Sequence, residues 1–279
     1  MSTLTLTLFM TPAQATEFQV GAGLEAFAWA NQADADVELG HVEVDGLLSL
    51  GSVEVRADLD VMTPDRSLHP EWGAVLVGVN NWRFAAGFSP LPTGREHVDP
   101  WHNATVPYSA AFERLYAGSL LGLRGQYDTG ALSVQAWGGA GDDFSQPAFG
   151  GGVLWGDGLR VGVDATAFPN QQRLYGHAFV TAPIQNITQL SAEGFYGQGD
   201  MAFVGTVELM PRAKVVPVVR GEFNRKSPGI TPWVIDAGVR VSPLESIRVT
   251  FTGRAIQDQW WGFVSLNLVD VADDEGWRF

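Results

Sequence analysis

Along most of the chain, apolar and polar residues alternate with a period of two. The alternation is sustained in segments 53–61, 159–167, 233–241 and 247–255, with Val234 as an exception. Because successive side chains of a β-strand point to opposite faces of its sheet, each segment has one apolar and one polar face. No stretch of useful length shows a helical period, so the pattern predicts an all-β chain.

Weaker alternation fills the rest of the chain and brings the expected total to about sixteen strands, with fourteen as the alternative count. The predicted strands cover residues 17–29, 38–49, 53–62, 72–79, 82–88, 118–127, 131–139, 149–156, 159–167, 173–181, 187–196, 201–209, 214–223, 233–241, 247–256 and 260–269.

The links between these strands alternate in length. Tight turns are expected at 80–81, 128–130, 157–158 and 211–213, where the residue types suit short hairpin connections. Longer links lie between them, at 30–37, 63–71, 89–117, 140–148, 168–172 and 224–232, although a few links near the end are short. Short periplasmic turns and longer external loops are typical of barrels in the bacterial outer membrane.

Two all-β architectures can accommodate amphipathic strands: a soluble protein with packed apolar faces, and a membrane barrel whose apolar faces meet lipid. About sixteen such strands without a fully buried one favour a single closed sheet. Aromatic residues gather at strand ends, as in membrane-interface girdles, and the chain ends in Phe279. We therefore predict a transmembrane antiparallel β-barrel, with the outer-membrane lipid bilayer as its surroundings.

Composition excludes several other classes of protein. The chain has 279 residues, no Cys and a formal net charge of −14. The charge argues against nucleic acid as a partner, and the lack of Cys removes disulfide frameworks and thiolate zinc sites. No run of eighteen or more apolar residues occurs, which argues against a simple transmembrane helix.

The N-terminus is similar to the end of an export signal. An apolar stretch from Leu4 to Met10 precedes a small-residue cleavage pattern at 13–15, although residues 1–3 lack a basic residue. We therefore expect residues 1–15 to be a signal-peptide remnant and residues 16–279 to form the barrel.

Two stretches are similar to a known family. Residues 86–96 read AGFSPLPTGRE, and Pro107, Tyr108 and Phe112 precede GSLLGLR at 118–124. These stretches resemble the start, the end and the returning strand of the long third loop in the Gram-negative outer-membrane porin superfamily, closest to its β-barrel porin group. The resemblance implies a channel and a homotrimer. One departure is 272–275, where acidic residues interrupt the terminal alternation, so either the last strand ends near Val269 or the register differs there.

An outward apolar face places the charged residues inside the barrel, because a charge facing the bilayer midplane costs about 2–4 kcal/mol. The residues predicted to line the pore are Arg83, Arg124, Arg160, Arg173, Arg220, Arg240, Arg248, Arg254, Asp58 and Asp60. Further inward residues are expected at Arg56, Lys214, Glu54, Asp164, Glu193, Glu222 and Asp236. Charged rings of this kind tune which ions pass through a channel.

The longest link, 89–117, carries enough aromatic and aliphatic residues to pack, and four prolines restrict its backbone. We predict that it enters the barrel as a constriction loop; an external flap on the rim is the alternative. The residues expected to line the constriction are Arg95, Glu96, Asp99, Glu113 and Arg114.

The sequence carries few signs of catalysis or metal binding. None of the five His has a zinc-protease spacing, and no nucleophile-elbow motif is present. His97 and His102 share a loop with Glu96 and Asp99, which leaves a metal site as a minor alternative. Ser109 with His102, and Ser67 with His69, are the loop pairs that an outer-membrane lipase or protease could use.

These observations predict a porin in the cell outer membrane that passes small hydrophilic solutes or ions by diffusion. It is expected to have no enzymatic activity and no cofactor. A barrel enzyme and a non-conducting structural barrel are the alternatives, and a barrel of about fourteen or more strands favours the pore.

Overall fold

The structure is a computed structural model of the whole chain. It describes residues 6–10, 14–62, 67–91, 109, 111, 115, 118–141, 145–185, 187–225, 233–244, 247–256 and 259–270. Among these residues, no helix is long and apolar enough to cross a membrane.

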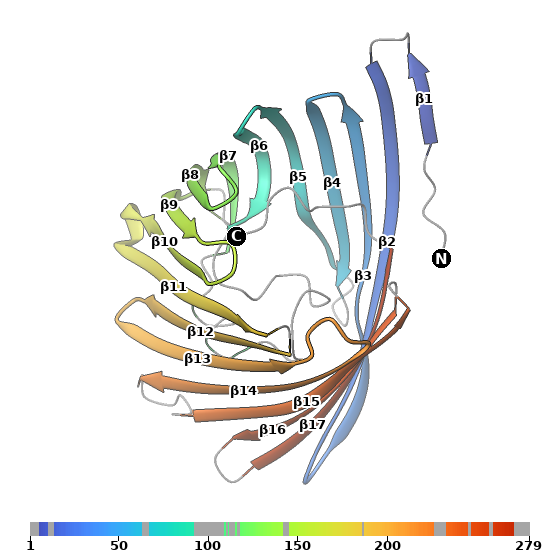
Figure 1. Cartoon of the computed structure of the whole chain (residues 1–279), viewed down its shortest axis with the longest axis vertical. Coiled ribbons are helices and arrows are strands. Elements are labelled where there is room, and N and C mark those ends of the chain that lie inside the picture. The colour runs from blue at the N-terminus through green and yellow to red at the C-terminus, as the bar shows by residue number, and fades with distance from the viewer. Residues whose placement is uncertain are drawn as a thin grey trace.

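One antiparallel sheet contains all the strands of the described chain, and the sixteen strands from β2 to β17 close into a ring (Figure 1). Each strand pairs with the next along the chain, and β17 pairs with β2 to close the barrel. The ring consists of β2 (Gln14–Asn31), β3 (Ala35–Leu50), β4 (Val53–Met62), β5 (Ser67–Val79), β6 (Trp82–Pro90), β7 (Ser119–Asp128), β8 (Leu132–Ala140), β9 (Pro147–Trp155), β10 (Arg160–Phe168), β11 (Arg173–Ile184), β12 (Thr188–Gly197), β13 (Asp200–Leu209), β14 (Val215–Arg225), β15 (Trp233–Leu244), β16 (Ile247–Ile256) and β17 (Gln259–Asp270).

The prediction of an all-β transmembrane barrel fold with about sixteen strands is confirmed, and the alternative of fourteen is wrong. Each predicted strand corresponds to one strand of the ring. The largest differences lie at β2, β3 and β5, which are longer than predicted. The register shifts between β4 and β5 at Asp58, so β5 continues past residue 72, where the predicted strand began; a second shift, near Glu25, lies within β2 and β3.

The links fall at the two ends of the barrel in turn. At one end, tight turns join β3 to β4 and β5 to β6; Asn80 supports the second turn with a φ of 55°. The other end carries the longest link, between Pro90 and Ser119, and a 3-10 turn, η2 (Pro169–Gln171), between β10 and β11. Not all links at this second end are long. Only residues 32–34 separate β2 from β3, because both strands extend toward each other along the chain.

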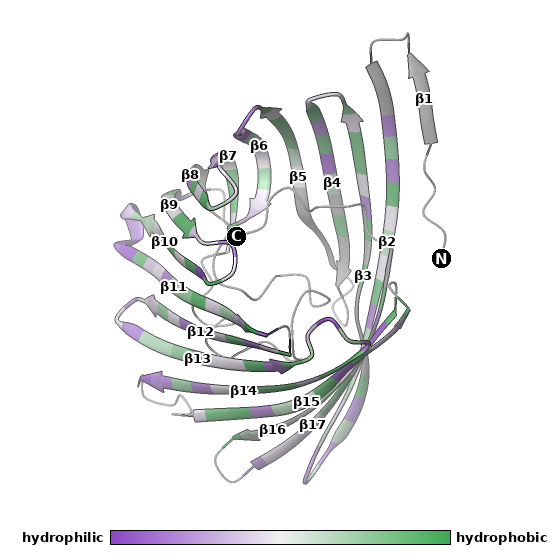
Figure 2. Cartoon of the chain, viewed as in Figure 1, coloured by the Kyte–Doolittle hydropathy of each residue, from purple (hydrophilic) through white to green (hydrophobic). Residues whose placement is uncertain are grey.

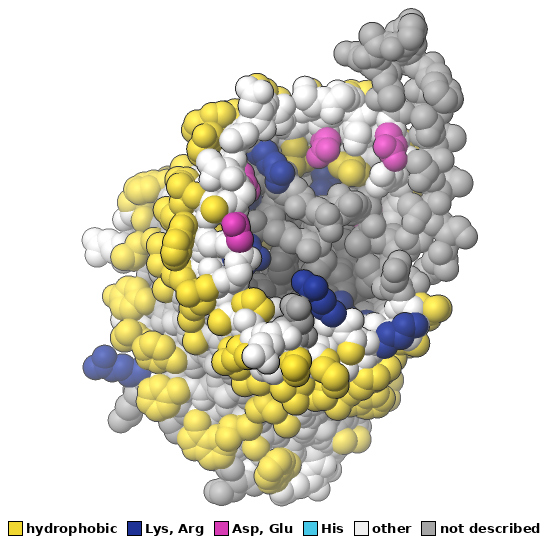
Figure 3. Space-filling model, in the orientation of Figure 1, with side chains coloured by type: hydrophobic (Ala, Val, Ile, Leu, Met, Phe, Trp, Pro, Cys, Tyr) yellow, Lys and Arg dark blue, Asp and Glu magenta, His cyan; other side chains and the backbone are white. Residues whose placement is uncertain are grey.

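The outer face of the wall is apolar and the inner face is polar, which is the reverse of the arrangement in a soluble protein. On β13 and β14, Phe203 and Phe223 point outward and are 51% and 54% exposed, whereas Glu208 and Arg220 point inward and are 5% and 3% exposed. Figure 2 shows this alternation as bands of opposite hydropathy along the strands. Figure 3 shows hydrophobic side chains covering the outer flank and most of the visible charged ones bordering the central hollow. The apolar exterior suits lipid, and the polar interior suits water.

The two ends of the chain meet the ring at β2 and β17. The short strand β1 (Leu6–Met10) lies within the predicted signal segment and pairs with residues 14–18 of β2. Cleavage after that segment remains a prediction. At the other end, β17 runs to Asp270, and the residues after it lie outside the described part of the chain.

Candidate functional site

The inner face of the wall holds many of the ionisable side chains that the alternation placed there. Arg124, Arg220 and Arg254 are buried, Arg83, Arg160, Arg240 and Arg248 are half-buried, and Arg173 is exposed at the start of β11. Asp58 and Asp60 lie in β4 with the same parity as inward-facing Arg56, but their side chains are outside the description. Lys214 lies in the turn before β14 and is exposed. Whether these residues line a conducting path remains a prediction.

One ionic network on this face spans β14, β15 and β16. Asp236 is the register partner of both Arg220 and Arg254, so one carboxylate lies between two guanidinium groups. Arg220 donates to Asp236 Oδ2 from Nε at 2.9 Å and from Nη2 at 2.6 Å. Arg254 Nε donates to Asp236 Oδ1 at 2.8 Å. The three side chains together carry one net positive charge in a fixed geometry.

A second ionic group spans β12, β13, β15 and β16 and lies further from the end with the longest link. Arg240 Nη2 lies 3.2 Å from Glu208 Oε2, and the Arg240 side chain is 13% exposed. Gln189 Nε2 donates to the other oxygen of Glu208 at 3.4 Å. Arg248 follows on β16, two residues before the register partner of Arg240. This part of the wall therefore presents a second region of positive charge to the interior.

The neighbouring wall, at β10 to β12, contains a histidine between two carboxylates. His177 Nδ1 lies 2.9 Å from Asp164 Oδ2, and Nε2 lies 3.1 Å from Glu193 Oε2. The His177 side chain is 0% exposed and its ring lies 4.8 Å from that of Phe195. Sequence reasoning placed Asp164 and Glu193 inside but missed this arrangement. The sequence did contain a signal for it: His177 has an inward position on β11, and the two carboxylates have inward positions on the neighbouring strands β10 and β12.

Inward apolar side chains form two buried clusters that the period-two pattern did not predict. One contains Leu91, which directly follows β6, and the other contains Ala111 and Leu115 from the long link. The first cluster comprises Leu91, Leu120, Trp137, Ala148, Phe168 and Tyr175; the second comprises Ala111, Leu115, Phe195, Ala202 and Val204.

The second cluster shows where part of the long link lies. Phe195 is on β12, and Ala202 and Val204 are on β13, all on the inner face and separated from β6 by β7 to β11. Ala111 and Leu115 are 0% and 3% exposed against them. These residues of the link therefore lie inside the barrel. The predicted constriction residues, Arg95, Glu96, Asp99, Glu113 and Arg114, lie outside the described residues.

The alternative catalytic and metal sites are only partly within the description. His97, His102 and the acidic residues near them lie outside it, and so do the side chains of Ser67 and His69. Ser109 is 1% exposed. Within the described ranges, no group of three or more His, Asp or Glu side chains is arranged to hold a metal ion.

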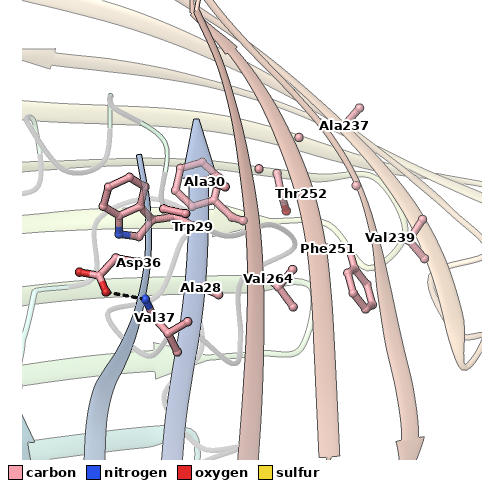
Figure 4. Close-up of a pocket in the computed structure, with 15 residues that line it drawn as sticks. Ala28, Trp29, Ala30, Asp36, Val37, Ala237, Val239, Phe251, Thr252 and Val264 are labelled. Atoms are coloured by element: carbon pink, nitrogen blue, oxygen red, sulfur yellow. Dashed lines mark hydrogen bonds between the residues drawn. The ribbon is translucent and has the colours of Figure 1, made fainter. Parts of the chain in front are cut away.

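A shallow depression of about 910 Å³ lies at β2, β3 and β15–β17 (Figure 4). Its floor follows one register row of small residues: Ala237, Gly253, Gly262, Ala30 and Ala35. Val239, Phe251 and Val264 border it on the lipid-facing side of the wall.

No protein-family model matches the sequence, and no curated protein matches it significantly. Solved structures do match. Outer-membrane-expressed OmpT of Vibrio cholerae has a TM-score of 0.67 at 12% identity, covering 94% of this chain and 99% of that one. A structure of in-vitro folded OmpT from the same organism, described as the trimer form, has a TM-score of 0.65 at 9% identity over 91% of this chain and 99% of that one.

An engineered porin gives a similar result. A triple mutant of the Rhodopseudomonas blastica porin has a TM-score of 0.64 at 8% identity, covering 91% of this chain and all of that one. The chain thus has the fold of outer-membrane β-barrels of the porin type, as the sequence resemblance predicted. The likeness supports the predicted location in the cell outer membrane.

Proposed function

We propose that this protein is an outer-membrane porin, a water-filled channel through which small hydrophilic solutes and ions diffuse. The observation that carries the proposal is the closed sixteen-stranded ring with an apolar outer face and ionic networks on its inner face. Barrels of about sixteen strands are too wide for wall side chains to fill, so they leave an aqueous channel.

The long link between β6 and β7 narrows this channel in the proposed mechanism. Ala111 and Leu115 fix one part of the link to β12 and β13, while Leu91 packs at its start. The intervening chain would cross the interior and bring Arg95, Glu96, Asp99, Glu113 and Arg114 into the path of the solutes. The inward arginines of β14 to β16 would then set the electrostatic potential that each ion meets.

We propose that the channel has no enzymatic activity. Both ring nitrogens of His177 lie within hydrogen-bond distance of carboxylates, so neither is available to take a proton from a nucleophile. His177 is the one histidine whose side chain lies in the described part of the chain.

The homotrimer is also a proposal. Its support is the shared fold with OmpT, one structure of which is described as a trimer form. The small-residue row at the depression in Figure 4 would let a neighbouring barrel approach closely. Native mass measurement in mild detergent tests the assembly, and Gly253→Leu should reduce the trimer fraction if the row is the contact.

Single-channel recording in a planar bilayer tests the pore. The purified protein should give stepwise conductance in KCl, and a salt gradient should give a reversal potential that reports its ion preference. A correctly folded, membrane-inserted barrel that gives no conductance would favour the structural-barrel alternative.

A further inference from the structure

Three aromatic side chains form a shelf on the inner face of β17 and β2. Trp29 and Trp261 have ring centroids 5.5 Å apart, and Phe263 lies 6.3 Å from Trp261 with nearly parallel ring planes. All three face inward, with the same parity as Ser265 and Asn267, which are fully buried. We call Trp29, Trp261 and Phe263 the aromatic shelf.

The shelf differs from the other aromatic groups inside the barrel. Trp137, Phe168, Tyr175 and Phe195 are buried in the two apolar clusters and are 2–8% exposed. The three shelf rings belong to neither cluster and are half-buried. Large aromatic surfaces left open toward an aqueous interior are the surfaces that apolar parts of a solute cover.

A positive charge borders one side of the shelf. Arg254 is the register partner of Trp261, and its guanidinium carbon lies 5.8 Å from the centroid of Phe263. Asp236 accepts hydrogen bonds from both Arg254 and Arg220, so two guanidinium groups lie around one carboxylate on this side. A carboxylate that approaches the shelf from β16 would therefore meet a favourable potential.

A negative charge borders the other side. Asp36 on β3 is the register partner of Trp29, and it is exposed. Figure 4 shows its carboxylate beside the indole of Trp29, with one oxygen accepting a hydrogen bond from the Val37 amide at 2.7 Å. An ammonium group next to this carboxylate would also lie near the negative face of the indole ring.

We propose that the aromatic shelf, with Arg254 and Asp36 at its two sides, is a solute-binding site for small zwitterions with a flat apolar ring, of which aromatic amino acids are the simplest. The ring would lie on the shelf, the carboxylate toward Arg254 and the ammonium toward Asp36. The site lies near the barrel end that carries the longest link, because Trp29 and Trp261 are close to the link-side ends of their strands. This inference rests on the proposed pore function, because it names the class of solute that the pore would capture.

Calorimetric titration of the refolded, full-length barrel in detergent tests the site with four probes. L-phenylalanine carries all three recognised features, phenethylamine lacks the carboxylate, 3-phenylpropionate lacks the ammonium group and glycine lacks the ring. We expect L-phenylalanine to bind most tightly and glycine to bind at least about tenfold more weakly. Equal binding of glycine and L-phenylalanine, or no binding of any probe, would overturn the proposal.

Matched variants assign the contributions. Trp29→Leu should weaken L-phenylalanine binding about tenfold, whereas Trp260→Leu, which removes an outward-facing indole one residue from Trp261, should leave it unchanged. Asp36→Asn should weaken phenethylamine and spare 3-phenylpropionate, and Arg254→Gln should do the reverse. Asp34→Asn removes the same charge as Asp36→Asn from the adjacent turn and serves as its control. Equal losses from Trp29→Leu and Trp260→Leu, or from Asp36→Asn and Asp34→Asn, would overturn the site.

KCl conductance of the same preparations separates the two proposals. A barrel that conducts KCl but does not discriminate among the probes overturns the binding site and leaves the pore intact. A barrel that binds L-phenylalanine through Trp29 but conducts nothing upholds the site and overturns the pore function.

Discussion

Two adjacent sectors of the wall, β10–β13 and β14–β17, have similar outer faces and different inner faces. Val163 and Val219 point to the lipid side at 50% and 49% exposure, one in each sector. Inside, the first sector holds His177 between two carboxylates and a buried apolar cluster against the long link. The second holds the arginine network and two rings of the half-buried aromatic shelf, Trp261 and Phe263.

The difference indicates that the two sectors have different roles in the barrel. Inward apolar residues in the first sector, such as Phe195 and Val204, are covered by the chain itself, so that sector anchors the link. Arg240 and Trp261 in the second sector are only half-buried, so the chain covers them less completely.

The largest effect should come from charging the shared outer face. Val163→Arg in the first sector and Val219→Arg in the second should both prevent membrane insertion, because each places a guanidinium against hydrocarbon at about 2–4 kcal/mol near the midplane. Insertion into lipid vesicles, followed by protease protection, measures the outcome. Val163→Leu and Val219→Leu keep the apolar character and should insert normally. Normal insertion of both arginine variants would contradict the lipid-facing assignment.

The next effect concerns the histidine of the first sector. His177→Ala should lower the stability of the barrel by about 3–5 kcal/mol, because Asp164 and Glu193 would be left buried without their shared partner. The urea midpoint of unfolding in detergent measures the loss.

A double replacement checks the cause of this loss. Adding Asp164→Asn and Glu193→Gln to His177→Ala should restore part of the stability by removing the two buried charges. A triple variant that is less stable than His177→Ala would instead indicate that the loss comes from packing against Phe195.

A smaller and more local effect should follow from weakening the contact between the long link and β12–β13. Leu115→Ala removes a buried side chain from the cluster with Phe195 and Val204, which costs about 2–5 kcal/mol in well-packed sites. The long link should then leave the wall more often, so mean single-channel conductance and its noise should rise. Phe203→Leu changes an outward residue of β13 and should leave the conductance at its original value. Unchanged noise in Leu115→Ala would favour a link that does not control the channel.

The alternation in the sequence predicted most of this architecture, because it reports which face of each strand meets lipid. Segment 247–255 became the regular part of β16, with Phe251 outward and Arg254 inward. The strands β2 and β3 were underpredicted at their ends, where residues 14–16, 30–31 and 35–37 extend the pairing beyond the predicted segments.

The inner clusters were harder to predict because they depend on neighbours across the ring. Inward Phe195 and Val204 break the polar inner face, and only their contact with Leu115 explains them. His177 likewise gains its partners from β10 and β12, more than ten residues away in either direction. A sequence pattern fixes the face of a residue but not the register that aligns it with its partners.

The smallest predicted effect tests whether the second sector, and not the first, sets ion preference. Arg240 is the least buried arginine for which an ion pair is resolved, with Glu208 as its partner. Arg240→Gln should shift the reversal potential toward cations while the barrel assembles normally, because one inward positive charge is lost from a wall that solutes reach. Arg220→Glu and Arg254→Glu are poorer tests, since each would place a new carboxylate beside buried Asp236. Arg212→Gln, in the exposed turn before β14, removes the same charge from outside the barrel wall and should shift the potential less. Equal shifts from Arg240→Gln and Arg212→Gln would mean that net charge, and not the inner face of the second sector, determines selectivity.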